Sequence, residues 1–125
     1  MNRTTRRVGL AALALALLSA LPAAAQDYPN KPIKIIAPFP AGTGPDANTR
    51  EIAQELTKAL GQSVVVENRP GASTMIGMEA GAKATPDGYT LVMGSTTSMS
   101  VVPYTYGAKV PYKVERDYVP ISIVG

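Results

Sequence analysis

The residues best suited to binding chemistry stand in three short segments rich in Gly, Ser and Thr, each of which follows an apolar run. The first segment, 39–46, contains prolines and glycines and ends in a carboxylate, where an amphipathic stretch begins. A helix that starts there would present unpaired backbone N–H groups and partial positive charge, which attract anions. Small residues also let a ligand approach the backbone closely. The segment therefore predicts an anion site formed by Phe39, Ala41, Gly42, Thr43 and Asp46.

Two of these residues have alternative roles that the pattern leaves open. Asp46 is expected to cap the helix that follows it, to contact the ligand, or to do both, because the two roles are compatible. Phe39, the only phenylalanine, either covers a ligand or fills a gap in the core.

The other two segments supply hydroxyl groups. Ser73 and Thr74 come shortly after a Pro-Gly pair, and Ser95, Thr96 and Thr97 come directly after a glycine. Ordinary polar loops have such compositions, but loops that follow parallel strands gather at the edge of the sheet where ligands bind. We therefore expect these hydroxyls to hydrogen-bond a ligand.

Composition excludes several kinds of function. The chain has 125 residues with no His and no Cys, so it lacks the commonest general base and metal ligand and all thiol chemistry. The acids form no evident catalytic pair, and no suitably placed base could activate a serine. From residue 26 onward nine basic and nine acidic residues balance, whereas a nucleic-acid surface needs a basic excess. We expect no catalytic residue, no metal, no cofactor and no nucleic-acid partner.

The beginning of the chain has the layout of an export signal. Three arginines stand among the first seven residues, an uncharged apolar run covers 8–18, and small residues follow at 23–25. The run is shorter than the ~20 residues of a membrane-spanning helix. Residues 1–25 are therefore predicted to be a signal peptide that directs the rest of the chain to the periplasm. The arginine pair leaves general and twin-arginine export both open.

Apolar runs alternate with amphipathic stretches along the remaining chain, which predicts an α/β fold with a parallel sheet built from βαβ units. Because the loops after such strands share one edge, the three polar segments should lie together. The chain ends directly after its last apolar run, which suggests a sequence cut short. We predict strands at 33–37, 64–66, 89–93 and 119–124, and helices at 46–60, 73–84 and 101–106, with Gly61 as a C-cap.

A dinucleotide site is the rival interpretation. Residues 42–47 match the Gly-x-Gly-x-x-Ala fingerprint, and Glu67 lies where a ribose-binding acid belongs. However, the prolines at 38–40 lengthen the loop, and Asp46 would place negative charge beside the pyrophosphate. This motif alone is weakly specific.

Several ordered motifs resemble one family, the extracytoplasmic solute receptors of the tripartite tricarboxylate transporter system, often called Bug receptors. The resemblance covers the whole chain after the signal segment. The motifs that carry it are Ala37-Pro-Phe-Pro-Ala-Gly42 with Asp46, Leu60-Gly-Gln62, Val64-Val-Val-Glu-Asn-Arg-Pro-Gly-Ala72, Ala82-Lys-Ala84, Pro86-Asp-Gly-Tyr-Thr-Leu-Val-Met-Gly94, Pro111-Tyr112 and Asp117-Tyr-Val-Pro-Ile121.

The resemblance implies a two-lobed, type II periplasmic binding protein, of which residues 26–125 would be the first part of lobe 1. Such receptors capture small carboxylates with backbone N–H groups, hydroxyls and water, and deliver them to permease subunits in the membrane. A monomer is expected. Thr43 and the pair Ser73-Thr74 stand where the family usually has glycines, so the ligand of a relative cannot be transferred to this chain.

The length of the chain leads to a further expectation. A piece of one lobe would leave sheet edges unpaired and would bind nothing tightly on its own. A non-functional piece with receptor ancestry is therefore a third hypothesis, beside the receptor and the dinucleotide enzyme.

Overall fold

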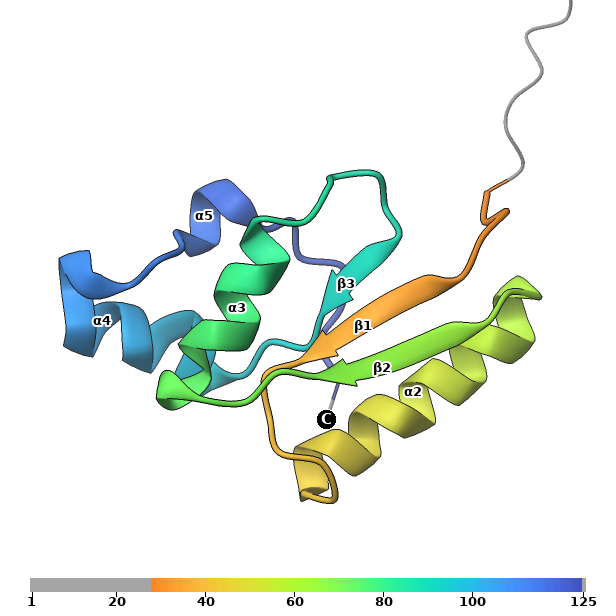
Figure 1. Ribbon diagram of the computed structural model, residues 1–125, viewed down its shortest axis with the longest axis horizontal. Helices are drawn as coiled ribbons and strands as arrows, with labels where there is room; N and C mark the ends of the chain where they lie inside the picture. The colour runs from red at the N-terminus through yellow and green to blue at the C-terminus, as the bar shows by residue number, and fades with distance from the viewer. Residues whose placement is uncertain (1–27, 125) are drawn as a thin grey trace, which may run out of the picture.

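The computed structural model describes residues 28–124 (Figure 1), so the predicted signal peptide lies outside the described residues. The fold is α/β, as the sequence predicts, with short 3-10 and π-helical turns between the main elements. The elements are β1 (Ile33–Ala37), α2 (Gly44–Leu60), β2 (Val64–Asn68), η1 (Ala72–Thr74), α3 (Met75–Ala82), β3 (Thr90–Val92), η2 (Thr97–Val101), α4 (Val102–Tyr106), η3 (Gly107–Lys109) and α5 (Val114–Asp117).

The sheet is parallel, and its strand order is β2-β1-β3. The central strand β1 is almost entirely apolar and buried, which is typical of a strand covered on both faces. In the register of the sheet, Ala37 lies beside Asn68 and Ile36 lies beside Val92. The carboxyl ends of the strands therefore meet at one edge, and the segments that follow them start from that edge.

Two helices cover the sheet. Helix α2 packs on β1 and β2, and α3 packs on β1 and β3. Right-handed crossovers in opposite directions place the two helices on opposite faces, above and below the strands in Figure 1. None of the helices in residues 28–124 combines the length and the hydropathy of a membrane-spanning segment.

The boundaries of α2 differ from the prediction at one end. The helix starts at Gly44 because Pro45 is well suited to its first turn, and Thr43 occupies the N-cap position. Asp46 is therefore inside the first turn and is not the N-cap that the sequence suggested. At the other end the prediction is confirmed: Gly61 adopts a left-handed conformation, φ 66°, and donates its N–H to the Thr57 carbonyl at 3.1 Å.

Two further predictions of secondary structure are wrong. The third polar segment, expected as a loop ahead of the helix at 101–106, turns helical from residue 96, and η2 and α4 follow without a break. Residues 119–124 form no strand, and Val119, Ile121 and Ile123 are 88%, 79% and 99% exposed. A β-strand is stabilised by pairing with a neighbouring strand, and within the described residues no strand pairs with residues 119–124.

Helix α3 approaches the strand ends very closely. A Cβ placed on Gly77 would lie 2.7 Å from the Arg69 carbonyl oxygen and 2.7 Å from the Pro38 Cβ. These atoms belong to the segments that leave β2 and β1. The glycine thus allows α3 to pack directly on the chain where it leaves β1 and β2, next to the segments that the sequence marks as a binding site.

This contact makes Gly77 a test of the packing. Gly77→Ala should lower the free energy of unfolding by about 1–3 kcal/mol, because backbone atoms have to move. Gly44→Ala is the matched control, since a Cβ there meets nothing within 4 Å, and it should stay within about 0.5 kcal/mol of wild type. Urea unfolding followed by circular dichroism measures both, and equal stabilities would contradict the packing described.

Candidate functional site

The three candidate segments start beside one another at the carboxyl edge of the sheet. The Arg69 N–H donates to the Ala37 carbonyl at 2.9 Å, and the Met93 N–H donates to the Ile36 carbonyl at 2.9 Å. Parallel pairing thus continues one residue past β2 and β3. This arrangement agrees with the prediction of a shared edge.

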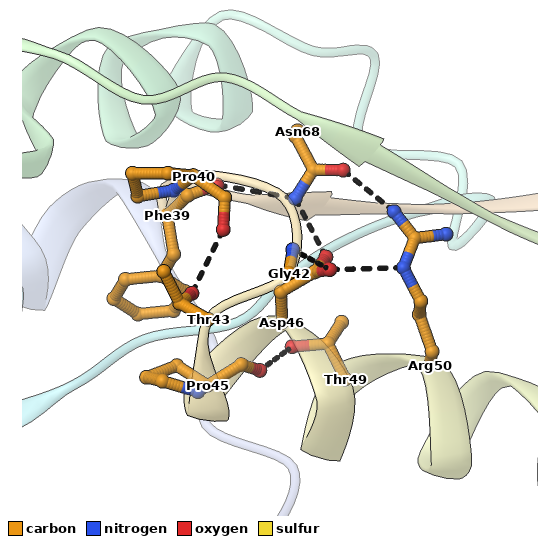
Figure 2. A network of polar contacts seen from close by, with 9 residues as sticks. All are labelled: Phe39, Pro40, Gly42, Thr43, Pro45, Asp46, Thr49, Arg50 and Asn68. Carbon is orange, nitrogen blue, oxygen red and sulfur yellow. Dashed lines mark hydrogen bonds and ion pairs between the residues drawn. The ribbon is translucent and has the colours of Figure 1, made fainter.

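Asp46 is the centre of a hydrogen-bond network that joins the first segment to the sheet (Figure 2). Its side chain is buried, with the residue 2% exposed. Oδ2 accepts from the Gly42 N–H at 2.8 Å and from Arg50 Nε at 3.0 Å, and Oδ1 accepts from Asn68 Nδ2 at 2.7 Å. The carboxylate therefore joins three elements: the loop before α2, helix α2 itself and the neighbouring strand β2.

These donors keep the carboxylate ionised. The Asn68 amide, then the Gly42 N–H, then the Arg50 guanidinium lower the pKa of Asp46 to about 2. A negative charge is thus enclosed at the edge of the sheet, and its compensation is built from three separate segments of the chain.

Asn68 makes three contacts in this network. Besides its bond to Asp46, Nδ2 donates to the Phe39 carbonyl at 3.1 Å, and Oδ1 accepts from Arg50 Nη2 at 2.7 Å. The charged face of α2 is thus more than a solvated surface at this position, because the half-exposed Arg50 guanidinium bridges α2 and β2.

The first segment consequently offers fewer free amides than its sequence suggests. The Gly42 N–H is directed at Asp46, and the Thr43 N–H lies 3.4 Å from the Pro40 carbonyl, which also accepts the Thr43 hydroxyl. The helix start at Gly44 remains as its source of amides, since such groups lack intrahelical partners. Phe39 is half-buried, while Ala41 and Gly42 are exposed.

The second segment has an unusual backbone. Ala72, Ser73 and Thr74 have φ values of 46°, 52° and 78°, which L-residues rarely adopt. Such conformations cost about 1–3 kcal/mol each and cluster at functional sites. Thr74 holds the N-cap position of α3, but its hydroxyl makes no cap bond and is buried without a partner within the described residues.

The third segment uses its serines to start a helix. The Ser95 N–H donates to Ser98 Oγ at 2.8 Å, and the Ser98 N–H donates to Ser95 Oγ at 3.2 Å, which is the reciprocal pattern of a capping box. Thr96 and Thr97 are exposed in the first turn. The buried Tyr112 donates its hydroxyl to the Ser98 carbonyl at 2.5 Å, and burial raises the pKa of this phenol.

The structure divides the candidate residues into two groups. Turn η1 packs against η2, which brings together the segments of Ser73-Thr74 and of Thr96-Thr97. The segment from Phe39 to Asp46 instead leaves the shared edge toward α2, on the other side of the sheet in Figure 1. The predicted residues therefore share one edge of the sheet, but those of the first segment do not face those of the second and third segments.

An open groove of about 600 Å³ lies elsewhere, along α2 and the edge strand β2. The groove is lined by Arg50, Ala53, Gln54, Thr57, Lys58, Val64, Val65 and Val66.

Within residues 28–124, no cluster of three or more His, Cys, Asp or Glu side chains is arranged to hold a metal ion.

Sequence reasoning missed the residues that hold the candidate segments in place. Asn68 ends a strand directly before Arg-Pro-Gly, and this position at the predicted ligand edge could have marked it. Ser98 and Tyr112 carry no such signal, because their contact joins residues that are 14 positions apart.

Comparison with known proteins decides the family. Residues 48–125 match the model of the tripartite tricarboxylate transporter family receptor. The chain belongs to this family. Protein BugT of Bordetella pertussis is 45% identical over 106 residues, which cover 85% of this chain and 32% of that protein. The resemblance predicted from the sequence motifs is thereby confirmed.

Solved structures agree with this assignment. A periplasmic transporter is similar with a TM-score of 0.66 and 41% identity, over 68% of this chain and 28% of that one. Rpa4515 of R. palustris, solved with adipate, has a TM-score of 0.55 and 37% identity over 56% of this chain and 23% of its own. The periplasmic binding protein BugD has a TM-score of 0.51 and 42% identity, over 52% of this chain and 22% of that one. The chain spans about a third of the length of the curated relatives it matches.

The enclosed carboxylate predicts a specific dependence of stability on pH. The pKa of Asp46 is lower in the folded chain than its ordinary 3.8, so the unfolded chain binds more protons below pH 4. Its contribution to stability is complete above pH 4 and is lost as the pH falls through about 2. Asp46→Asn should therefore be less stable than wild type at pH 7, by a margin that shrinks between pH 4 and 2.

Urea unfolding over this pH range measures that margin. Asp117→Asn is a matched control, because the Arg116 guanidinium and the Lys113 N–H also lower the pKa of Asp117 to about 2, at a separate place. The two effects should add in the double variant. A constant difference between wild type and Asp46→Asn would contradict the bonding described for the folded state.

Proposed function

We propose that this chain is the first part of lobe 1 of a periplasmic receptor that captures small carboxylates for a tripartite transporter. The observation that carries the proposal is the meeting of three strand ends, each followed by the start of a helix, at one edge of a parallel sheet. Such edges bind anions through backbone N–H groups. Membership of the receptor family supports the same class of ligand.

The electrostatics of the edge favour an anionic ligand. Asp46 is buried and compensated, so its charge is shielded from an incoming carboxylate. Glu67, the acid beside Asn68, is paired with Lys34 at 2.7 Å and with Arg69 at 2.5 Å. A dicarboxylate of the adipate kind, the ligand named for one structural neighbour, is the natural first probe.

In this proposal the ligand contacts come from three places. The segment from Phe39 to Asp46, which includes the start of α2, supplies backbone N–H groups. Ser73-Thr74 and the segment from Ser95 to Thr97 supply backbone N–H groups and hydroxyls. The receptor acts as a monomer in the periplasm and passes its ligand to permease subunits, without transforming it. Residues 1–25 direct its export.

A dinucleotide is the second candidate ligand, favoured by the Gly-x-Gly-x-x-Ala spacing. The structure weakens this candidate at a particular atom. The Gly42 N–H, which would face a pyrophosphate, donates to Asp46. Because that N–H is already engaged, it is not available to hold a pyrophosphate.

Titration of the chain with adipate tests the proposal. Adipate should shift the backbone amide signals of the start of α2 and of residues 73–75 and 95–97 in ¹H–¹⁵N NMR spectra. Binding should be weak, because one part of one lobe covers the ligand on one side. Dimethyl adipate, which has the same length and no charge, should shift none of these signals.

The same titration separates the candidates. NAD should leave the amides of Gly42 and Glu67 unchanged, and saturable shifts there would favour the dinucleotide site instead. Nanomolar binding of adipate would contradict the expectation that this chain binds nothing tightly on its own.

A further inference from the structure

Asn68 stands apart from the other residues at the strand ends because its one amide group contacts three residues, which belong to two other parts of the chain. It lies at the end of β2, yet it reaches the Phe39 carbonyl in the first segment, and Asp46 and Arg50 in α2. Figure 2 shows its side chain above the turn that encloses Gly42. Its Nδ2 donates to two acceptors, the Phe39 carbonyl and the Asp46 carboxylate. Both acceptors belong to the candidate ligand segment, which ends in the first turn of α2.

We propose that Asn68 is the positioning residue of the ligand segment: its amide fixes the turn from Phe39 to Asp46 against the end of the neighbouring strand before any ligand arrives. The effect of Asn68 on ligand affinity rests on the proposed function, whereas its effect on the turn does not. A segment that is ordered in advance loses less conformational freedom when a ligand binds, so affinity rises without any contact between Asn68 and the ligand.

The chemistry requires an amide at this place. The Phe39 carbonyl and the Asp46 carboxylate accept hydrogen bonds, so the group between them has to donate, whereas Arg50 Nη2 donates, so the same side chain also has to accept. Asparagine supplies both functions on a short side chain. Aspartate has the same shape but cannot donate when ionised, and it would place a second negative charge 2.7 Å from Asp46 Oδ1.

The acid next to Asn68 in β2 does not share this task. Arg50 is the charged group that contacts Asp46 among residues 28–124, and Glu67, one position before Asn68, pairs with Lys34 and Arg69 instead. Glu67→Gln is therefore a matched control: it changes a side chain of β2 next to Asn68 and leaves the network of Asp46 in place.

The test without ligand follows the Gly42 amide, which donates to Asp46. In wild type its chemical shift should titrate with a midpoint of about 2, the pKa of Asp46, and its hydrogen exchange should be slowed. In Asn68→Ala and Asn68→Asp the midpoint should rise toward the ordinary 3.8, and exchange should become about tenfold faster. Glu67→Gln should match wild type. If Asn68→Ala fails to fold, the isosteric Asn68→Asp decides the question.

A second measurement tests the consequence for binding. With adipate as the probe, Asn68→Ala should bind about tenfold more weakly than wild type, while Glu67→Gln should bind at least as well as wild type. An unchanged midpoint and exchange rate for Gly42 in both Asn68 variants would overturn the inference, whatever adipate does. Failure of wild type to bind adipate, with Gly42 released in the variants, would overturn the proposed function and leave the positioning role standing.

Discussion

The burial of one carboxylate is the constraint on which the edge of this structure depends. A buried negative charge is costly unless it is paired and hydrogen-bonded on all sides. Asp46 meets that requirement with donors from its own loop, its own helix and the neighbouring strand. Hydrogen bonds are directional, so these bonds fix the position of the start of α2 relative to the end of the sheet. Apolar packing has no preferred direction and would define that position less closely.

The polar residues at the strand ends consequently divide between support and exposure. Asp46, Ser95 and Ser98 are used within the fold, whereas Ser73, Thr96 and Thr97 remain exposed. The exposed Ser73 belongs to the strained turn η1, which packs against α3 and η2. A receptor built in this way would recognise its ligand mainly through backbone groups whose positions are set by side chains behind them.

Patterns in the sequence predicted the local part of the fold well. The apolar run of β1, the C-cap at Gly61 and the short helix before Tyr106 depend on neighbours within a few residues, and all three are confirmed. The helical turn after Ser95 was missed because serine and threonine favour loops and helix starts alike. The predicted strand at 119–124 failed because its alternating pattern meets no partner within the described residues.

The sequence by itself determined the parallel α/β class, the order of the main elements, the edge at which polar segments gather and the family, because periodicity and ordered motifs are properties of the chain. Only the tertiary structure decided which polar groups point inward. Asp46 and Asn68 are 22 positions apart, and Asn68 and Phe39 are 29 apart. Such contacts form when a strand and a loop are brought side by side by the sheet, and no local pattern records them.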